Sequence, residues 1–102
     1  MNSSSEMLTI RIFPQLTVGP ELVGRAAGAR LREEILRAAG SAVVVVDFKG
    51  IETVSPSFAD ELFGKLPPEI VRRRRVRFAG ASDEVRALAR GVRGLRSELA
   101  AT

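Results

Sequence analysis

The sequence predicts a small α/β fold whose elements follow the order β-α-β-α-β-α. Three observations predict it: a β-branched run at residues 43–46 ends in Asp47, segments with helical spacing flank that run, and a segment of alternating apolar residues comes before them. Strands that alternate with helices, one of them apolar throughout, are typical of a parallel sheet layered with helices. The 102 residues fit one such domain, because single domains commonly hold roughly 100–150 residues.

The first strand is predicted from an alternating pattern. Residues 1–6 are polar and predict a disordered lead, so that the domain itself covers residues 7–102. From Met7 to Phe13, apolar Leu8, Ile10 and Ile12 alternate with other residues, which is the pattern of a half-buried strand. Pro14 is expected to end this strand, and a turn-rich passage follows.

The first helix is expected to begin at Glu21 or Arg25 and to end at Ala39, before Gly40 in the usual place of a glycine after a helix. Gly28 lies inside it, although glycine costs about 1 kcal/mol relative to alanine in a helix. Either the helix begins late, at Arg25, or Gly28 lets a neighbouring backbone come close. The apolar stripe predicted to be buried consists of Val23, Ala27, Leu31 and Ile35, widened by Leu22, Ala26 and Leu36.

The central strand is predicted at residues 41–48, where the run of valines leaves no polar face. Such a strand is expected to be buried on both sides, in the middle of a sheet that helices cover on each face. Asp47 lies at its carboxyl end, where open α/β sheets place their functional loops.

The second half of the chain supplies two further helices and one strand. Pro56 is expected to be the first residue of a helix that Ser55 or Ser57 caps and that Pro67-Pro68 ends. Residues 69–75 then form a connection to a short strand at 76–80. Ser82 caps the last helix, whose predicted buried stripe is Val85, Leu88, Ala89, Val92, Leu95 and Leu99.

The composition argues against an enzyme. The chain has no cysteine and no histidine, which excludes disulfides, zinc sites of the Cys/His type and histidine-based acid–base catalysis. No glycine loop of the phosphate-binding kind is present. We therefore expect a non-enzymatic protein without cofactor or metal; a divalent-ion site at Asp47 or Asp60 is the least favoured alternative. No apolar stretch is long enough to span a membrane, and no export signal is seen. A cytoplasmic location without a membrane partner is therefore expected.

A cluster of arginines gives the C-terminal third its positive charge. Residues 66–102 hold nine basic and four acidic residues, and Arg72, Arg73, Arg74 and Arg75 are consecutive. One interpretation is an anion-binding site that contacts the phosphates of a nucleic acid. The other is a solvated loop whose arginine stems lie on apolar surface, favoured by the lack of aromatic residues between the arginines for base stacking.

Three side chains near the start of the second helix are candidates for contact with a partner. Asp60 and Glu61 are adjacent, so they point about 100° apart on a helix and cannot form an acid–base pair alone. They are either a solvated pair or an acidic edge that a partner contacts. Ser57 is either a simple capping residue or a switch, because a phosphate there would meet free N–H groups and the positive end of the helix dipole.

Residues 43–66 resemble the STAS-like domain family of unknown function. Its members pair a strand and loop like Asp47-Phe48-Lys49-Gly50 with a helix like the one at residues 57–65, Ser-Phe-Ala-Asp-Glu-Leu-Phe-Gly-Lys. Residues 25–35 are similar to the family's first helix, and residues 76–88 to its last strand and helix. The resemblance extends over residues 7–99 and implies the same α/β fold.

More distantly, the chain is similar to the STAS domains of anti-sigma-factor antagonists. Those domains are non-enzymatic switches that an ATP-dependent partner kinase phosphorylates on a serine at this helix start. The resemblance places Ser57 on that position, although Ser55, Pro56 and Phe58 stand where the antagonists have Asp, Ser and Gly. It implies a regulatory or protein-interaction module whose partner is an ATP-binding kinase and whose partner-binding residues are Ser55, Ser57, Asp60 and Glu61.

Overall fold

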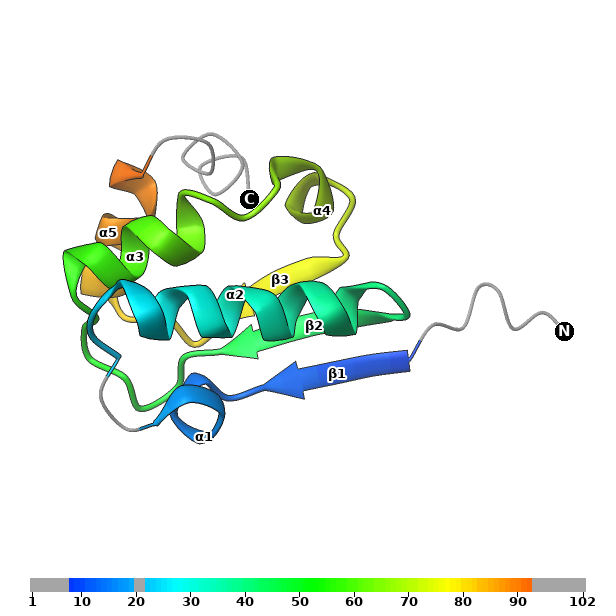
Figure 1. Ribbon diagram of the computed structural model, residues 1–102, viewed down its shortest axis with the longest axis horizontal. Coiled ribbons are helices and arrows are strands. Elements are labelled where there is room, and N and C mark those ends of the chain that lie inside the picture. Colours follow the sequence, from blue (N-terminus) through cyan, green and yellow to red (C-terminus); the bar gives the residue numbers. More distant parts are fainter. Residues whose placement is uncertain (1–7, 20–21, 93–102) are drawn as a thin grey trace, which may run out of the picture.

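The computed structural model describes residues 8–19 and 22–92, which form an α/β domain (Figure 1). Its elements are β1 (Leu8–Ile12), α1 (Pro14–Val18), α2 (Arg25–Ala39), β2 (Ala42–Asp47), α3 (Pro56–Phe63), α4 (Pro68–Arg72), β3 (Val76–Ala79) and α5 (Asp83–Gly91). The predicted lead at residues 1–6 and the predicted helical positions Leu95 and Leu99 lie outside the described residues. The predicted α/β class is confirmed, with two short helices added to the expected order.

The described strands form one parallel sheet in the order β1-β2-β3. Ile10 lies opposite Val44, and Val44 lies opposite Val76 on its other side. All three arrows in Figure 1 therefore point the same way, and the loops after β2 and β3 leave from the same edge. We call this edge the carboxyl end of the sheet.

The central strand β2 is fully covered on one face only. Val44 and Val46 have no exposed surface, but Val43 and Val45 are half-buried. The expectation that β2 is buried on both faces is therefore wrong. On the face of Val45, the neighbours in register are Arg11 and Arg77, and both are exposed. A run of valines is compatible with either arrangement, since it does not tell how many helices pack on each side.

The edge strand β1 is more exposed than its alternating pattern predicts. Leu8 is 73% exposed and Ile10 38%, and only Ile12 is half-buried. The strand hydrogen-bonds to β2 along one side, and no described strand pairs with its other side. The expectation that β1 is half-buried is therefore wrong. As the edge strand, β1 lies outside the part of the sheet that the helices mainly cover, which is β2 and β3.

Helix α2 begins at Arg25 and buries a stripe that differs from the predicted one. The buried residues of α2 are Gly28, Leu31, Ile35 and Ala39, while Leu36 is 37% exposed and Val23, which precedes the helix, 57%. The prediction is confirmed for Leu31 and Ile35, and for Leu22 before the helix, which is 4% exposed. It is wrong for Val23 and Leu36, and it leaves out Gly28, which has no apolar side chain to indicate burial.

Gly28 is buried because the backbone of α3 passes directly over it. A Cβ at position 28 would lie 2.8 Å from the carbonyl oxygen of Phe58 and 2.9 Å from the Cβ of Glu61, closer than real side chains approach. Both alternatives left open by the sequence thus hold: α2 begins late, and Gly28 permits a close approach. This close approach fixes α3 relative to α2.

Two short helices were not predicted, and both begin with a proline. Pro14 ends β1 as expected but is also the first residue of α1. Pro68 follows the end of α3 and is the first residue of α4. Proline suits the first position of a helix because its missing N–H would have no partner there. None of the described helices has the length and apolar character needed to cross a membrane.

Candidate partner-binding site

Ser55 caps α3 and also ties the start of that helix to the segment before α2. Its hydroxyl oxygen accepts hydrogen bonds from the backbone N–H of Phe58 at 3.1 Å and of Gly24 at 2.9 Å. Its own N–H donates to the carbonyl of Leu22 at 3.2 Å. Of the two serines named as candidate caps, Ser55 is therefore the capping residue, with Pro56 at the first helical position.

Ser57 lies in the first turn of α3 with its hydroxyl 3.2 Å from that of Ser55. A serine oxygen has two lone pairs, and Ser55 uses both for the N–H groups of Gly24 and Phe58. The hydrogen between the two hydroxyls must therefore come from Ser55. Ser57 accepts it and keeps its own hydrogen available to another molecule. Since Ser57 is half-buried, it is neither sealed beneath the fold nor needed as the cap.

The loop between β2 and α3 is held by two buried side chains and presents the residues between them. Ile51 is 8% exposed and Val54 5%, whereas Glu52 and Thr53 are exposed. The hydroxyl of Ser82 donates to the carbonyl of Glu52 at 2.6 Å, which joins the loop to the start of α5. The exposed part of this loop is thus held in place from both sides.

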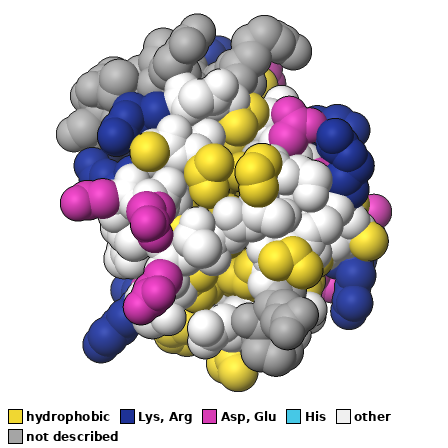
Figure 2. Space-filling view, turned by 90° about the vertical axis from the view of Figure 1, so that its left-hand side faces the viewer, with side chains coloured by type: hydrophobic (Ala, Val, Ile, Leu, Met, Phe, Trp, Pro, Cys, Tyr) yellow, Lys and Arg dark blue, Asp and Glu magenta, His cyan; other side chains and the backbone are white. Residues whose placement is uncertain are grey.

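We name the carboxyl-end surface after the sheet edge on which it lies. It consists of Glu52, Thr53, Pro56, Ser57 and Asp60, which are exposed or half-buried. Figure 2 looks onto this side of the molecule, where hydrophobic side chains lie in the middle and both acidic and basic side chains lie toward the left and right edges. The surface is mixed in character, as partner-binding surfaces commonly are.

Asp60 and Glu61 have different environments although they are adjacent. The Asp60 side chain is 53% exposed and pairs with Arg25 at 3.0 Å. The Glu61 side chain is 11% exposed and pairs with Arg25 at 3.4 Å, Arg32 at 3.4 Å and Lys65 at 3.2 Å. Glu61 therefore joins α2 to α3 inside the domain, and Asp60 is the acidic group of this pair that a partner could reach. The prediction of partner contact stays untested for both.

The pKa of Glu61 is held below its ordinary value of 4.5 by the hydrogen bond and charge of Lys65, with the arginines adding to the effect against the cost of burial. A lowered pKa in the folded state means that the unfolded chain binds protons first as the pH falls. The stabilisation by Glu61 is therefore complete above the pKa of an unfolded glutamate and is lost as the pH drops through the folded value.

We expect acid to destabilise the domain partly through Glu61. The free energy of unfolding, measured by urea denaturation, should fall between about pH 5 and pH 3, and the fall should be smaller for Glu61→Gln. Glu33→Gln is the control, because Glu33 is exposed on α2 and makes no ion pair with the described residues. An equally steep fall in Glu61→Gln would contradict the role of these ion pairs.

Asp47 holds the end of β2 in place. Its carboxylate accepts a hydrogen bond from the backbone N–H of Lys49 at 2.9 Å and pairs with Arg11 of β1 at 2.6 Å. The Lys49 N–H, more than Arg11, lowers the pKa of Asp47, against the effect of burial. Gly80, with φ +68°, packs so close that a Cβ there would lie 2.8 Å from the carboxylate. No group of three or more residues able to hold a metal ion occurs within 8–19 and 22–92.

The arginine run lies at the opposite end of the sheet, where α4 leads into β3. Arg75 is only half-exposed, and its guanidinium donates to the carbonyl of Ala39 at the end of α2. Arg73 and Arg74 are exposed, and Arg74 has a φ of +61° in the turn before β3. Within this run, Arg75 therefore has a structural contact, whereas Arg73 and Arg74 are exposed to solvent. Anion binding by Arg72, Arg73, Arg74 and Arg75 stays a prediction.

Sequence reasoning missed the groups that fix the start of α3 from elsewhere in the chain. Arg25 and Arg32 reach Glu61 over 36 and 29 residues, and Gly24 reaches Ser55 over 31. No local pattern indicates such pairs. The charge complementarity of a basic helix face and an acidic one was the available signal, but many other pairings fit it equally well.

With this geometry established, the chain can be compared with known families. Residues 27–86 match the family described as a STAS-like domain of unknown function. The chain belongs to this family. The matched part of the STAS-like domain runs from α2 into α5 and includes the whole carboxyl-end surface, which agrees with the resemblance seen in residues 43–66. No match was found among curated proteins or among solved structures.

Proposed function

We propose that this STAS-like domain is a non-enzymatic regulatory module that binds a protein partner through its carboxyl-end surface. The observation that supports the proposal is the arrangement of the two serines. Ser55 bears the structural hydrogen bonds, which leaves the Ser57 hydroxyl half-buried at the surface with a hydrogen of its own. The family itself is consistent with a regulatory role, but a fold alone does not define a partner.

The surface is suited to binding because it is both accessible and pre-organised. Ile51 and Val54 anchor its loop in the core, and Ser55 fixes the first turn of α3. A partner would therefore lose little entropy in ordering the loop, which favours affinity. Asp60 adds an exposed charge that can select a partner with basic groups.

Within this proposal, Ser57 is the site of a phosphate switch. Asp60 and Glu61 follow Ser57 by three and four residues, so all three lie on one helix face. A phosphate adds about −1.5 to −2 charges beside these carboxylates and would compete with them for Arg25. Modification would then weaken the Arg25 bridge from α2 to α3 and change the charge of the surface at once. The resemblance to anti-sigma-factor antagonists favours an ATP-binding kinase as the partner.

Site-specific cross-linking tests the proposal. A photo-crosslinking amino acid is placed at Thr53 or at Asp60, and the protein is irradiated in cells of its own host. We expect both positions to capture the same protein. Glu33 on α2 is the matched control position, because it is also exposed but lies off the carboxyl-end surface. Capture of nothing from either position, or of the same protein from Glu33, would contradict the proposal.

The captured protein then tests the switch. When it is purified and mixed with this STAS-like domain and ATP, we expect one added phosphate on the peptide that contains Ser57. Ser57→Ala should abolish the addition and should still be folded, since Ser57 is not the cap. A partner that binds but never modifies Ser57 would leave the binding role standing and refute the switch.

A further inference from the structure

A cavity of about 110 Å³ lies between β3, α3 and α5, next to the carboxyl-end surface but not part of it. Its floor is aromatic. Phe48, Phe63 and Phe78 line it, and the rings of Phe63 and Phe78 meet edge to face, with centroids 5.3 Å apart. Phe48 lies 6.1 Å from Phe63 and 6.3 Å from Phe78. These are three of the five phenylalanines in the chain.

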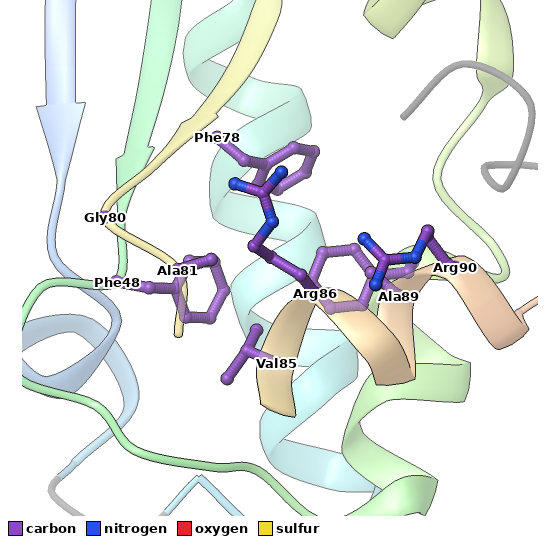
Figure 3. Close-up of a pocket in the computed structure, with 9 residues that line it drawn as sticks. Phe48, Phe78, Gly80, Ala81, Val85, Arg86, Ala89 and Arg90 are labelled. Carbon is purple, nitrogen blue, oxygen red and sulfur yellow. The ribbon is translucent and has the colours of Figure 1, made fainter. Parts of the chain in front are cut away.

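The remaining walls are small and apolar, and the rim is positive. Ala81, Val85 and Ala89 contribute the apolar walls. Gly80 also lines the cavity, and Arg86 and Arg90 lie one helical turn apart on α5 at its rim. Figure 3 shows Arg86 and Arg90 on successive turns of α5, both drawn among the residues that line the pocket. Apolar depth below a charged rim is the arrangement of a small-ligand site.

The two rim arginines have no carboxylate partner among the described residues, a property that they share with Arg30. Arg11, Arg25, Arg32 and Arg37 pair with acidic side chains, whereas neither Arg86 nor Arg90 pairs with any acidic side chain of residues 8–19 and 22–92. Asp83 lies one turn before Arg86 and still makes no ion pair with it. Two like charges one turn apart on a helix repel each other, so an anion between them would be stabilising.

We infer that this cavity binds a small organic anion that consists of one aromatic ring and a carboxylate. The ring would pack against the phenylalanine floor, and the carboxylate would lie near Arg86 and Arg90, since guanidinium groups bind carboxylates through paired hydrogen bonds. At about 110 Å³ the cavity is smaller than the about 150 Å³ that encloses a benzene ring, so only part of the ring would enter it and the carboxylate would stay at the rim. A larger group, such as a nucleoside, would not fit.

The experiment is a titration of the full chain with benzoate, followed by ¹H–¹⁵N NMR. We expect saturable shifts at the amides of Gly80, Ala81 and Val85. The double variant Arg86→Gln/Arg90→Gln should bind about tenfold or more weakly, as expected when hydrogen bonds to charged groups are lost. Arg30→Gln is the matched control, an exposed arginine of α2 that makes no ion pair with the described residues. It should bind as the unchanged protein does.

Benzamide gives a second comparison that needs no variant, because it has the same ring without the charge. It should bind the unchanged protein much more weakly than benzoate. Shifts that do not saturate or that map to another part of the domain would overturn the inference. Equal binding of benzamide and benzoate, or an unchanged affinity in the double variant, would overturn it as well.

Discussion

Replacing Gly28 by alanine is expected to lower the free energy of unfolding by about 1–3 kcal/mol, the usual cost of forcing an extra group into a packed core. The new Cβ would stand 2.8 Å from the Phe58 carbonyl oxygen and 2.9 Å from the Glu61 Cβ. The first of these is backbone in the first turn of α3, so it cannot turn aside as a flexible side chain could. The whole helix would have to shift, against the generally better helix propensity of alanine.

Gly91→Ala is the matched control for this prediction. Gly91 is also helical, but a Cβ there would meet nothing within 4 Å. We expect this variant to be unchanged or up to about 1 kcal/mol more stable. Urea denaturation of both variants measures the difference. If Gly28→Ala were as stable as the unchanged protein, α2 and α3 would not pack as closely as described.

Ser55→Ala is expected to cost about 2 kcal/mol, made up of roughly 1 for the lost cap and roughly 1 for a second N–H left without its acceptor. The two affected donors are the backbone N–H groups of Phe58 and Gly24. Ser57→Ala removes a hydroxyl whose hydrogen-bond partner among the described residues is the Ser55 hydroxyl. Its effect should stay within about 0.5 kcal/mol, as is usual for surface positions without a structural role.

Denaturation of the two serine variants, compared under the same conditions, decides between their roles. A larger loss in Ser57→Ala than in Ser55→Ala would show that the hydrogen bonds are assigned to the wrong serine. The comparison also has a practical consequence. Ser57→Ala can be used to test modification without disturbing the fold. Loss of partner binding in Ser55→Ala, by contrast, could result either from the lower stability of the domain or from a lost contact with the partner.

The start of α3 shows how much of the candidate site could be predicted from sequence. Ser-Pro-Ser before an apolar run predicts a capped helix with Pro56 first, and the structure confirms it. The cap bond from the Phe58 N–H to Ser55 is local, but the second bond that Ser55 accepts could not be predicted, because it comes from Gly24, which the fold brings to Ser55 across 31 residues. The local sequence predicts the helix, whereas the second role of Ser55, its link to the segment before α2, depends on a distant residue.

Glu61 illustrates the same limit in the energetics of the site. Its position one residue after Asp60 suggests two similar acidic groups. The 100° turn between them directs Glu61 toward α2 and Asp60 toward solvent, and only the packing at Gly28 decides which one is buried. The sequence also could not show which face of β2 is only half-buried. Val43 and Val45 on that face are as apolar as Val44 and Val46 on the buried face.

Hydrogen–deuterium exchange of the purified domain, alone and in complex with the protein captured by cross-linking, tests the central claim most directly. Binding at the carboxyl-end surface predicts slower exchange of the amides of residues 49–60, with residues 72–77 unchanged. Slower exchange confined to residues 72–77, or to the face of the sheet that bears Arg11 and Arg77, would contradict the claim.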